Sequence, residues 1–178
     1  HKFGVHQRLS LAQKANKTPH QLVMTATPIP RSLTMSAYAD LDTSVIDELP
    51  PGRQKIKTVA LSNNRRDELI EKIKQISNEG RQIYWVCTLI EESEALRAES
   101  AENTFNYLSS NLEGIRVVMI HGRLTKSEKE EIMNDFAEGR IDLLVATTVI
   151  EVGVNVPNAS LMIVENAERL GLAQLHQL

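Results

Sequence analysis

The stretch QIYWVCT at residues 82–88 decides the fold class, because it is a short apolar run without strict alternation of polar residues. Strands of a parallel sheet have this pattern when helices cover both faces of the sheet. Similar runs, rich in valine, isoleucine and leucine, occur at residues 58–61, 116–121, 142–147 and 160–165. We therefore predict five strands of a parallel sheet at these positions.

The segments between these runs have the spacing of amphipathic helices. One helix is predicted around residues 69–76 and a longer helical stretch at residues 91–112. Thr125 and Glu128 fit the capping box that begins a third helix, whose inward side chains are Ile132, Met133 and Phe136. Glycines that suit helix ends follow the three predicted helices at Gly80, Gly114 and Gly139. Repeated strand–helix units predict a doubly wound α/β domain, which binds ligands at the carboxyl ends of its strands.

The first part of the chain does not follow this repeat, although residues 22–27 form one further strand candidate and residues 31–39 a helix candidate. The Pro-Pro-Gly sequence at residues 50–52 is the best linker signal in the chain. We therefore expect three parts: a piece of a neighbouring domain at residues 1–50, a linker at 51–56 and the α/β domain at 57–178.

Composition excludes several classes of protein. The net charge of −3 argues against a generally basic surface that coats nucleic acid. Cys87 is the only cysteine, which excludes an internal disulfide and a cysteine-based metal cluster, and its apolar neighbours predict a buried, inert thiol. No apolar run approaches the roughly 20 residues of a membrane span. We therefore expect a cytoplasmic protein without a bound metal of its own.

Polar residues follow the predicted strands at the edge where ligands are expected. Thr25 and Thr27 end one strand, His121 and Gly122 follow another, and Thr147 begins a glycine-containing loop that extends to residue 157. Hydroxyl groups, free backbone N–H groups and a glycine that permits close approach are suited to phosphate oxygens. The strand ends therefore predict a phosphate-binding edge.

The same stretches resemble the motifs of superfamily-two helicases. MTATPIPR at residues 24–31 resembles motif III, ATTVIEVGVNVPNA at 146–159 resembles motif V, and ERLGLAQLHQL at 168–178 resembles the run into motif VI. HKFGV at residues 1–5 is similar to the residues after the acidic motif II. Residues 38–52 also resemble the RecG family, whose members are bacterial ATP-dependent helicases of branched DNA.

In that family two RecA-like lobes hold ATP between them and move along duplex DNA. The resemblance implies that residues 1–50 are the end of the first lobe and residues 57–178 the second. It implies that coupling between hydrolysis and lobe movement involves Thr25, Ala26, Thr27 and Arg31. It places ATP near Glu151, Gly153, Asn155 and Gln177, and DNA near Thr88, His121, Gly122, Thr147 and Thr148.

The resemblance also implies partners and cofactors. The DNA partner would be branched and double-stranded, as at replication forks and Holliday junctions in recombination and repair, and the protein partner would be the other lobe of the same polypeptide. ATP and Mg²⁺ would be the cofactors of the whole helicase. The magnesium ligands and the phosphate-loop lysine would precede this chain, and the motif VI arginines would follow Leu178. We therefore expect the chain alone to be inactive as an ATPase.

Several features of the sequence leave alternatives open. Asn155 occupies a position at which the family usually has aspartate, so the charge at that point of the ATP site is lost. The chain contains no phosphate-loop pattern, which would suit a non-catalytic α/β module that binds a nucleotide or a protein. The motor of a transcription-coupled repair translocase shares the ATPIPR and LAQLHQL signatures. Thr25, Thr27 and His121 could also serve only to end strands.

Overall fold

The computed structural model describes residues 22, 44, 46, 48, 55–88, 94–147 and 156–178. The chain divides into two units, and the helices and strands described here lie in the second unit, which extends from Lys55 to His176. The helix predicted at residues 31–39 and all but the first residue of the strand predicted at 22–27 lie outside the described residues. None of the described helices is long and apolar enough to cross a membrane.

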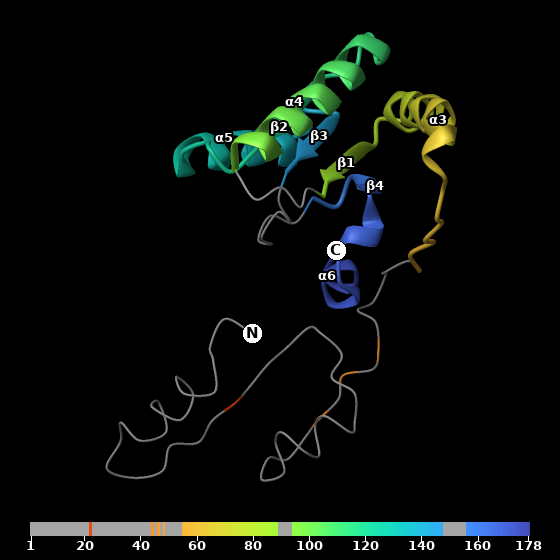
Figure 1. The fold of residues 1–178 in the computed structure, drawn as a ribbon, viewed down its shortest axis with the longest axis vertical. Coiled ribbons are helices and arrows are strands. Elements are labelled where there is room, and N and C mark those ends of the chain that lie inside the picture. Colours follow the sequence, from red (N-terminus) through yellow and green to blue (C-terminus); the bar gives the residue numbers. More distant parts are fainter. Residues whose placement is uncertain are drawn as a thin grey trace. The chain divides into compact units, whose positions relative to one another are not determined.

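The second unit alternates strands and helices, as Figure 1 shows. Its strands form one parallel sheet in the order β2-β3-β1-β4. This arrangement confirms the predicted doubly wound, RecA-like parallel α/β fold for the second unit. The elements are η1 (Asn63–Arg65), α3 (Arg66–Asn78), β1 (Gln82–Cys87), α4 (Glu94–Asn111), β2 (Val117–Ile120), α5 (Lys126–Ala137), β3 (Leu143–Ala146), β4 (Ala159–Glu165), η2 (Ala167–Arg169) and α6 (Leu172–Gln177).

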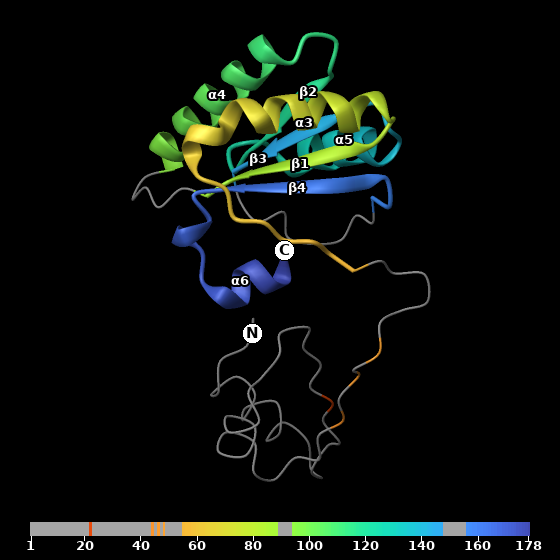
Figure 2. The same ribbon diagram turned by 90° about the vertical axis from the view of Figure 1, so that its right-hand side faces the viewer.

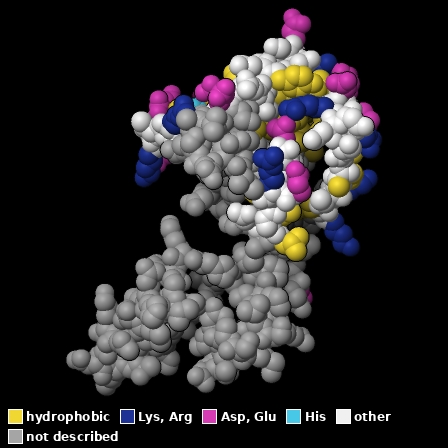
Figure 3. Space-filling view, viewed as in Figure 1, with side chains coloured by type: hydrophobic (Ala, Val, Ile, Leu, Met, Phe, Trp, Pro, Cys, Tyr) yellow, Lys and Arg dark blue, Asp and Glu magenta, His cyan; other side chains and the backbone are white. Residues whose placement is uncertain are grey.

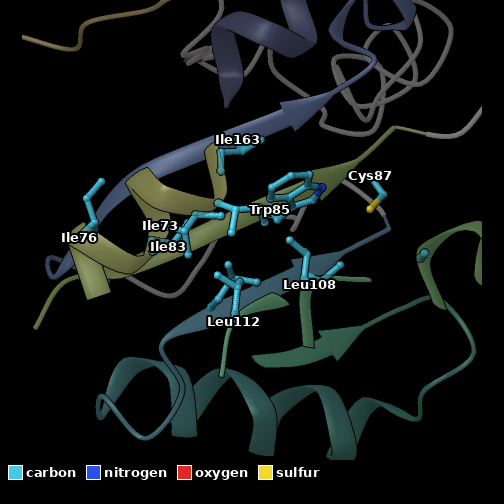
Figure 4. Packing of buried hydrophobic residues seen from close by; sticks show 12 residues of the cluster. Ile73, Ile76, Ile83, Trp85, Cys87, Leu108, Leu112 and Ile163 are labelled. Carbon is cyan, nitrogen blue, oxygen red and sulfur yellow. The ribbon is translucent and has the colours of Figure 1, made fainter. Parts of the chain in front are cut away.

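Helices cover both faces of the sheet, which is why its strands are continuously apolar (Figure 2). On one face, Ile83 and Trp85 of β1 pack with Ile73 of α3 and Leu108 of α4 (Figure 4). On the other face, Phe136 of α5 packs with residues of β2 and β3 and against a ring of β1. Successive residues of the central strands therefore contribute to two separate hydrophobic clusters.

The predicted helix boundaries are confirmed at both ends of α5. The Thr125 hydroxyl accepts the backbone N–H of Glu128, and the Glu128 carboxylate accepts the backbone N–H of Thr125, which completes the capping box. This cap contributes about 1 kcal/mol. The helix ends where Gly139 takes a φ of +76°, a left-handed conformation that side chains disfavour. Gly80 ends α3 in the same way, with a φ of +73°.

The strand predicted at residues 58–61 is wrong. Residues 55–62 have no regular secondary structure, and Val59 remains 61% exposed. A strand needs a neighbour that accepts its backbone hydrogen bonds, and β4, a strand at the edge of the described sheet, pairs only with β1 among the described strands. A short run of β-branched residues therefore does not predict a strand by itself, because the run does not show whether a partner strand lies beside it.

A polar residue stands at the amino end of each strand. Gln82, the first residue of β1, is buried and donates through its carboxamide to the carbonyl oxygens of Phe136 and Ile141. Asn158 precedes β4 and donates to the Gln82 carboxamide oxygen at 3.3 Å. Arg116 precedes β2 and pairs with Asp142, which precedes β3. These side chains join the starts of neighbouring strands to one another.

Asp142 predicts an acid-sensitive component of stability. Hydrogen bonds from the Arg116 guanidinium lower the pKa of Asp142, and partial burial opposes this shift. A carboxylate with a lowered pKa stabilises the fold above its ordinary pKa of about 4, and this contribution disappears as pH falls through the folded-state pKa. We expect the stability difference between wild type and Asp142→Asn, measured by urea denaturation, to be largest above about pH 5 and to shrink in acid.

A stability difference that is constant across this pH range would contradict the assignment. Glu138→Gln serves as the control, because Glu138 is an exposed carboxylate just after α5, where solvent screens its ion pair with Arg140. Its stability difference from wild type should change much less with pH.

Candidate functional site

The carboxyl ends of the four strands each carry a polar residue. These residues are Thr88 after β1, His121 after β2, Thr147 after β3 and Glu165 at the end of β4. Because the strands are parallel, the four positions lie at one edge of the sheet, in the order His121, Thr147, Thr88, Glu165. From the predicted strand ends, sequence analysis placed His121 and Thr147 at this edge, whereas Thr88 was expected near DNA from the resemblance to helicases.

His121 and Gly122 form the turn between β2 and α5. The carbonyl oxygen of His121 accepts the N–H of Leu124 at 3.3 Å, and the Lys129 ammonium donates to the Gly122 carbonyl oxygen at 3.0 Å. The Nδ1 atom of His121 is buried and has no hydrogen-bond partner among the residues that the structure describes. Hydrogen bonds from Thr125 lower the pKa of Glu128 next to this turn. The turn is therefore fixed by its backbone, and the imidazole retains an unused hydrogen-bonding atom.

Thr147 connects this turn to the middle of the sheet. Its side chain is buried, and its backbone N–H donates to the carbonyl oxygen of Ile120 at 3.2 Å. This bond extends the β2–β3 ladder by one residue beyond the end of β3. Thr147 therefore fixes the position from which the following loop departs.

Thr88 occupies the corresponding position after β1, but its hydroxyl is engaged within the protein. The residue is 5% exposed, and its hydroxyl is within hydrogen-bonding reach of the carbonyl oxygens of Glu165 and Asn166, the latter at 2.9 Å. A hydroxyl carries one proton, so these two carbonyls share it. In this structure Thr88 therefore holds the backbone that follows β4.

The Glu165 carboxylate is the centre of a polar cluster. Its Oε1 atom lies 3.0 Å from the Arg66 guanidinium, and its Oε2 atom accepts the Trp85 indole N–H at 3.1 Å and the Thr104 hydroxyl at 3.4 Å. The Cys87 thiol donates to the same oxygen at 3.8 Å. Only 18% of the Glu165 side chain is exposed. The cluster therefore joins α3, β1 and α4 to the end of β4.

The cluster predicts an unreactive thiol at Cys87. Burial, followed by the negative charge of Glu165, raises the pKa of the Cys87 thiol to about 12. Because the thiolate is the reactive form, roughly one molecule in ten thousand is reactive at about pH 8. We expect iodoacetamide to alkylate the folded chain at least about a hundredfold more slowly than the urea-unfolded chain. Equal alkylation rates in the two states would contradict the predicted burial.

Comparison with known proteins shows the family to which this domain belongs. The model of the Helicase conserved C-terminal domain matches residues 60–178, which is most of the chain. The chain belongs to this helicase family. It is 61% identical over its whole length to the ATP-dependent DNA helicase RecG of Escherichia coli strain K12, and 49% identical to RecG of Thermotoga maritima. It spans only 26% and 23% of the length of these relatives.

A solved structure also matches this chain in fold and sequence. The structure of RecG bound to a three-way DNA junction matches 92% of this chain and 22% of that one, with a TM-score of 0.70 and 42% identity. The resemblance to superfamily-two helicases and to RecG is therefore confirmed at the level of sequence and fold.

The helicase domain brings together the predicted DNA residues that lie within the described part. Thr88, His121, Gly122 and Thr147 follow three adjacent strands at the same edge. Gln177, a predicted ATP residue, is the last residue of α6, and its side chain is not described. The remaining predicted site residues lie outside the described residues: Thr25, Ala26, Thr27, Arg31, Thr148, Glu151, Gly153 and Asn155.

Two residues of the helicase domain were not predicted as site residues. Arg66 and Glu165 form the ion pair of the polar cluster at the end of β4. One sequence signal could have identified Arg66, because a cation in the first turn of a helix opposes the helix dipole. Its neighbour Arg65 instead forms an exposed ion pair with Glu68.

Proposed function

We propose that this chain is the second motor lobe of an ATP-dependent helicase that remodels branched DNA, with the end of the first lobe at residues 1–50 and a linker at 51–56. One observation carries the proposal. The similarity to RecG extends over the whole chain, whereas the general helicase domain model begins at residue 60. Residues before that point are therefore also RecG-like, including the stretch that resembles motif III.

The carboxyl edge of the sheet supports a role in binding the DNA backbone. The turn at Gly122 is exposed, and the Nδ1 atom of His121 beside it has no hydrogen-bond partner among the described residues. Acidic and basic side chains are interspersed over the described surface in Figure 3, which shows no broad basic face on that part of the surface. We propose that His121, Gly122, Thr147 and Thr148 contact phosphates locally, with Thr88 as a further candidate.

ATP is proposed to bind at the loop that follows β3, through Glu151, Gly153 and Asn155, together with Gln177 at the end of α6. Thr25, Ala26, Thr27 and Arg31 are proposed to couple hydrolysis to lobe movement. Among residues 55–88, 94–147 and 156–178, no group of three acidic, histidine or cysteine side chains is placed to hold a metal ion. In the whole helicase, ATP is proposed to bind together with Mg²⁺.

A chimeric helicase tests this function. The segment of Escherichia coli RecG that matches this chain is replaced by the chain itself, and ATP hydrolysis is measured with and without forked DNA. We expect fork-stimulated hydrolysis within about tenfold of the parent enzyme, because substitutions between homologues rarely remove transition-state contacts. A folded, DNA-binding chimera without fork-stimulated hydrolysis would refute the proposal. The same exchange with the Thermotoga maritima segment controls for domain exchange itself.

The motor of a transcription-coupled repair translocase is the alternative within the same class of enzyme. The resemblance of residues 38–52 to the RecG family, together with the 61% identity over the whole chain, favours the branched-DNA helicase. A longer natural protein that contains this chain separates the two, since the branched-DNA enzyme should be stimulated by a fork. Displacement of a stalled RNA polymerase without a response to forks would favour the translocase.

A further inference from the structure

Side chains from α3, β1 and α4 all bind the carboxyl end of β4, a strand at the edge of the described sheet. Both oxygens of the Glu165 carboxylate are used, Oε1 by Arg66 and Oε2 by donors from β1 and α4. The next peptide carbonyls are held by the Thr88 hydroxyl. The bonds therefore converge on the point at which the chain leaves the sheet.

Arg66 is positioned by more than its charge. Its guanidinium carbon lies 5.4 Å from the ring centre of Trp85 and 4.8 Å from that of Tyr107. It is also the first residue of α3, where the partial positive charge of the helix disfavours a cation. Cation–π contacts and the ion pair offset that cost, since a guanidinium suits stacking and carboxylate binding at once.

The chain changes direction immediately after Glu165. Asn166 has a φ of 51°, the one positive φ among the described residues other than glycine, and it begins η2. Asparagine tolerates this left-handed conformation better than most residues. The exit segment, defined as residues 166–178, then continues through η2 into α6. Its direction is set by the backbone at Glu165 and Asn166.

We propose that Glu165 is a positioning residue. By joining Arg66, Trp85 and α4, its carboxylate fixes the direction in which the exit segment leaves the sheet. Because this segment resembles the run into motif VI, the cluster links the face covered by α3 and α4 to the ATP site. Only the link to the ATP site rests on the proposed function, whereas the positioning of the exit segment does not.

The chemistry of the carboxylate distinguishes positioning from simple packing. The single carboxamide oxygen of a glutamine can occupy the position of only one carboxylate oxygen, so its NH₂ group then faces either Arg66 or the donors of β1 and α4. The substitution retains the size of the side chain. The hydrophobic cluster around Ile83 and Leu143 contains no atom of Glu165 and should remain intact. The expected change is therefore local to the exit segment and to Trp85.

The experiment uses NMR on the full 178-residue chain, labelled with ¹⁵N. Trp85 is the only tryptophan, so one indole N–H signal reports directly on the carboxylate. In Glu165→Gln we expect this signal to shift and its solvent exchange to increase about tenfold or more, because a bond to a charged acceptor is lost. Amide signals of residues 166–170 should shift as well, while those of α5 stay in place.

Two variants keep the test decisive. Glu68→Gln removes the neighbouring exposed ion pair with Arg65 and should leave the indole and exit-segment signals unchanged. Arg66→Lys retains the charge but loses the planar guanidinium that stacks on the two rings and pairs with Glu165. If Glu165→Gln does not fold, the same exit-segment signals are measured in Arg66→Lys. Selective shifts in residues 166–170 support the proposal. Unchanged exit-segment signals, or equal changes throughout the chain, would overturn it.

The consequence for the motor is measured in the chimeric RecG described above. Glu165→Gln in that chimera should lower kcat for fork-stimulated ATP hydrolysis about tenfold and leave KM within about twofold, as expected for an effect confined to the transition state. A raised KM with unchanged kcat would overturn the link to the ATP site. If the unsubstituted chimera is inactive, the proposed function fails, whereas the NMR result still decides the positioning role.

Discussion

Replacement of Phe136 by alanine is expected to lower the free energy of unfolding by about 3–5 kcal/mol, the range for removing a buried aromatic ring. Phe136 is completely buried in the cluster between α5 and the sheet. Its ring meets Tyr84 edge-on, with ring centres 4.7 Å apart. The cavity would also lie beside the carbonyl that accepts the Gln82 carboxamide. Packing and a buried hydrogen bond are therefore weakened together.

Urea denaturation followed by circular dichroism measures this effect. Asn134→Ala is the matched control, because Asn134 is exposed on the same helix and its substitution should change stability by less than about 0.5 kcal/mol. Both substitutions lie in α5, but Phe136 is buried whereas Asn134 is exposed. A loss below about 1 kcal/mol for Phe136→Ala would mean that this side of the sheet is not a packed core.

The 178-residue chain alone is expected to hydrolyse no ATP above background, with or without forked DNA. The sequence contains no phosphate-loop pattern, and phosphoryl transfer depends on positioned charges around the phosphates and the metal ion. The active RecG chimera provides the positive control, since it contains the same residues within a complete motor. The comparison therefore isolates the contribution of the missing groups.

Measurable turnover by the purified chain would contradict this expectation. A contaminating ATPase is revealed if Phe136→Ala, purified in the same way, retains the turnover at a temperature at which it is unfolded. Activity that disappears with the fold would instead show that the chain contains a catalytic site of its own.

The sheet was largely predictable because burial on both faces leaves a clear pattern. Four of the five predicted strands of the α/β domain are present, and their ends differ from the predicted ends by about one residue. The differences arise at polar ends such as Arg116 and Thr88, which lie just outside the ladders. The run at residues 58–61 has the same composition but no described partner strand, and composition alone does not reveal that.

The candidate site was predictable only as far as topology determines it. Parallel strands bring their carboxyl ends to one edge, so His121, Gly122, Thr147 and Thr88 could be grouped from the sequence. The cluster around Glu165 could not, because it depends on side chains of α3 and α4 that approach the sheet from distant positions. The sequence pattern shows which face of a helix is buried, but not which polar atoms meet there.

The polar residues before the strands have a consequence for evolution and design. Gln82, Arg116, Asp142 and Asn158 stand at the opposite edge of the sheet from Thr88, His121, Thr147 and Glu165. The first group contacts only other parts of the fold, whereas the second group contains the proposed DNA contacts His121 and Thr147 beside Thr88 and Glu165. Substitutions that stabilise the domain could therefore accumulate at the far edge without disturbing the candidate site. A thermostable version of this domain is best sought there.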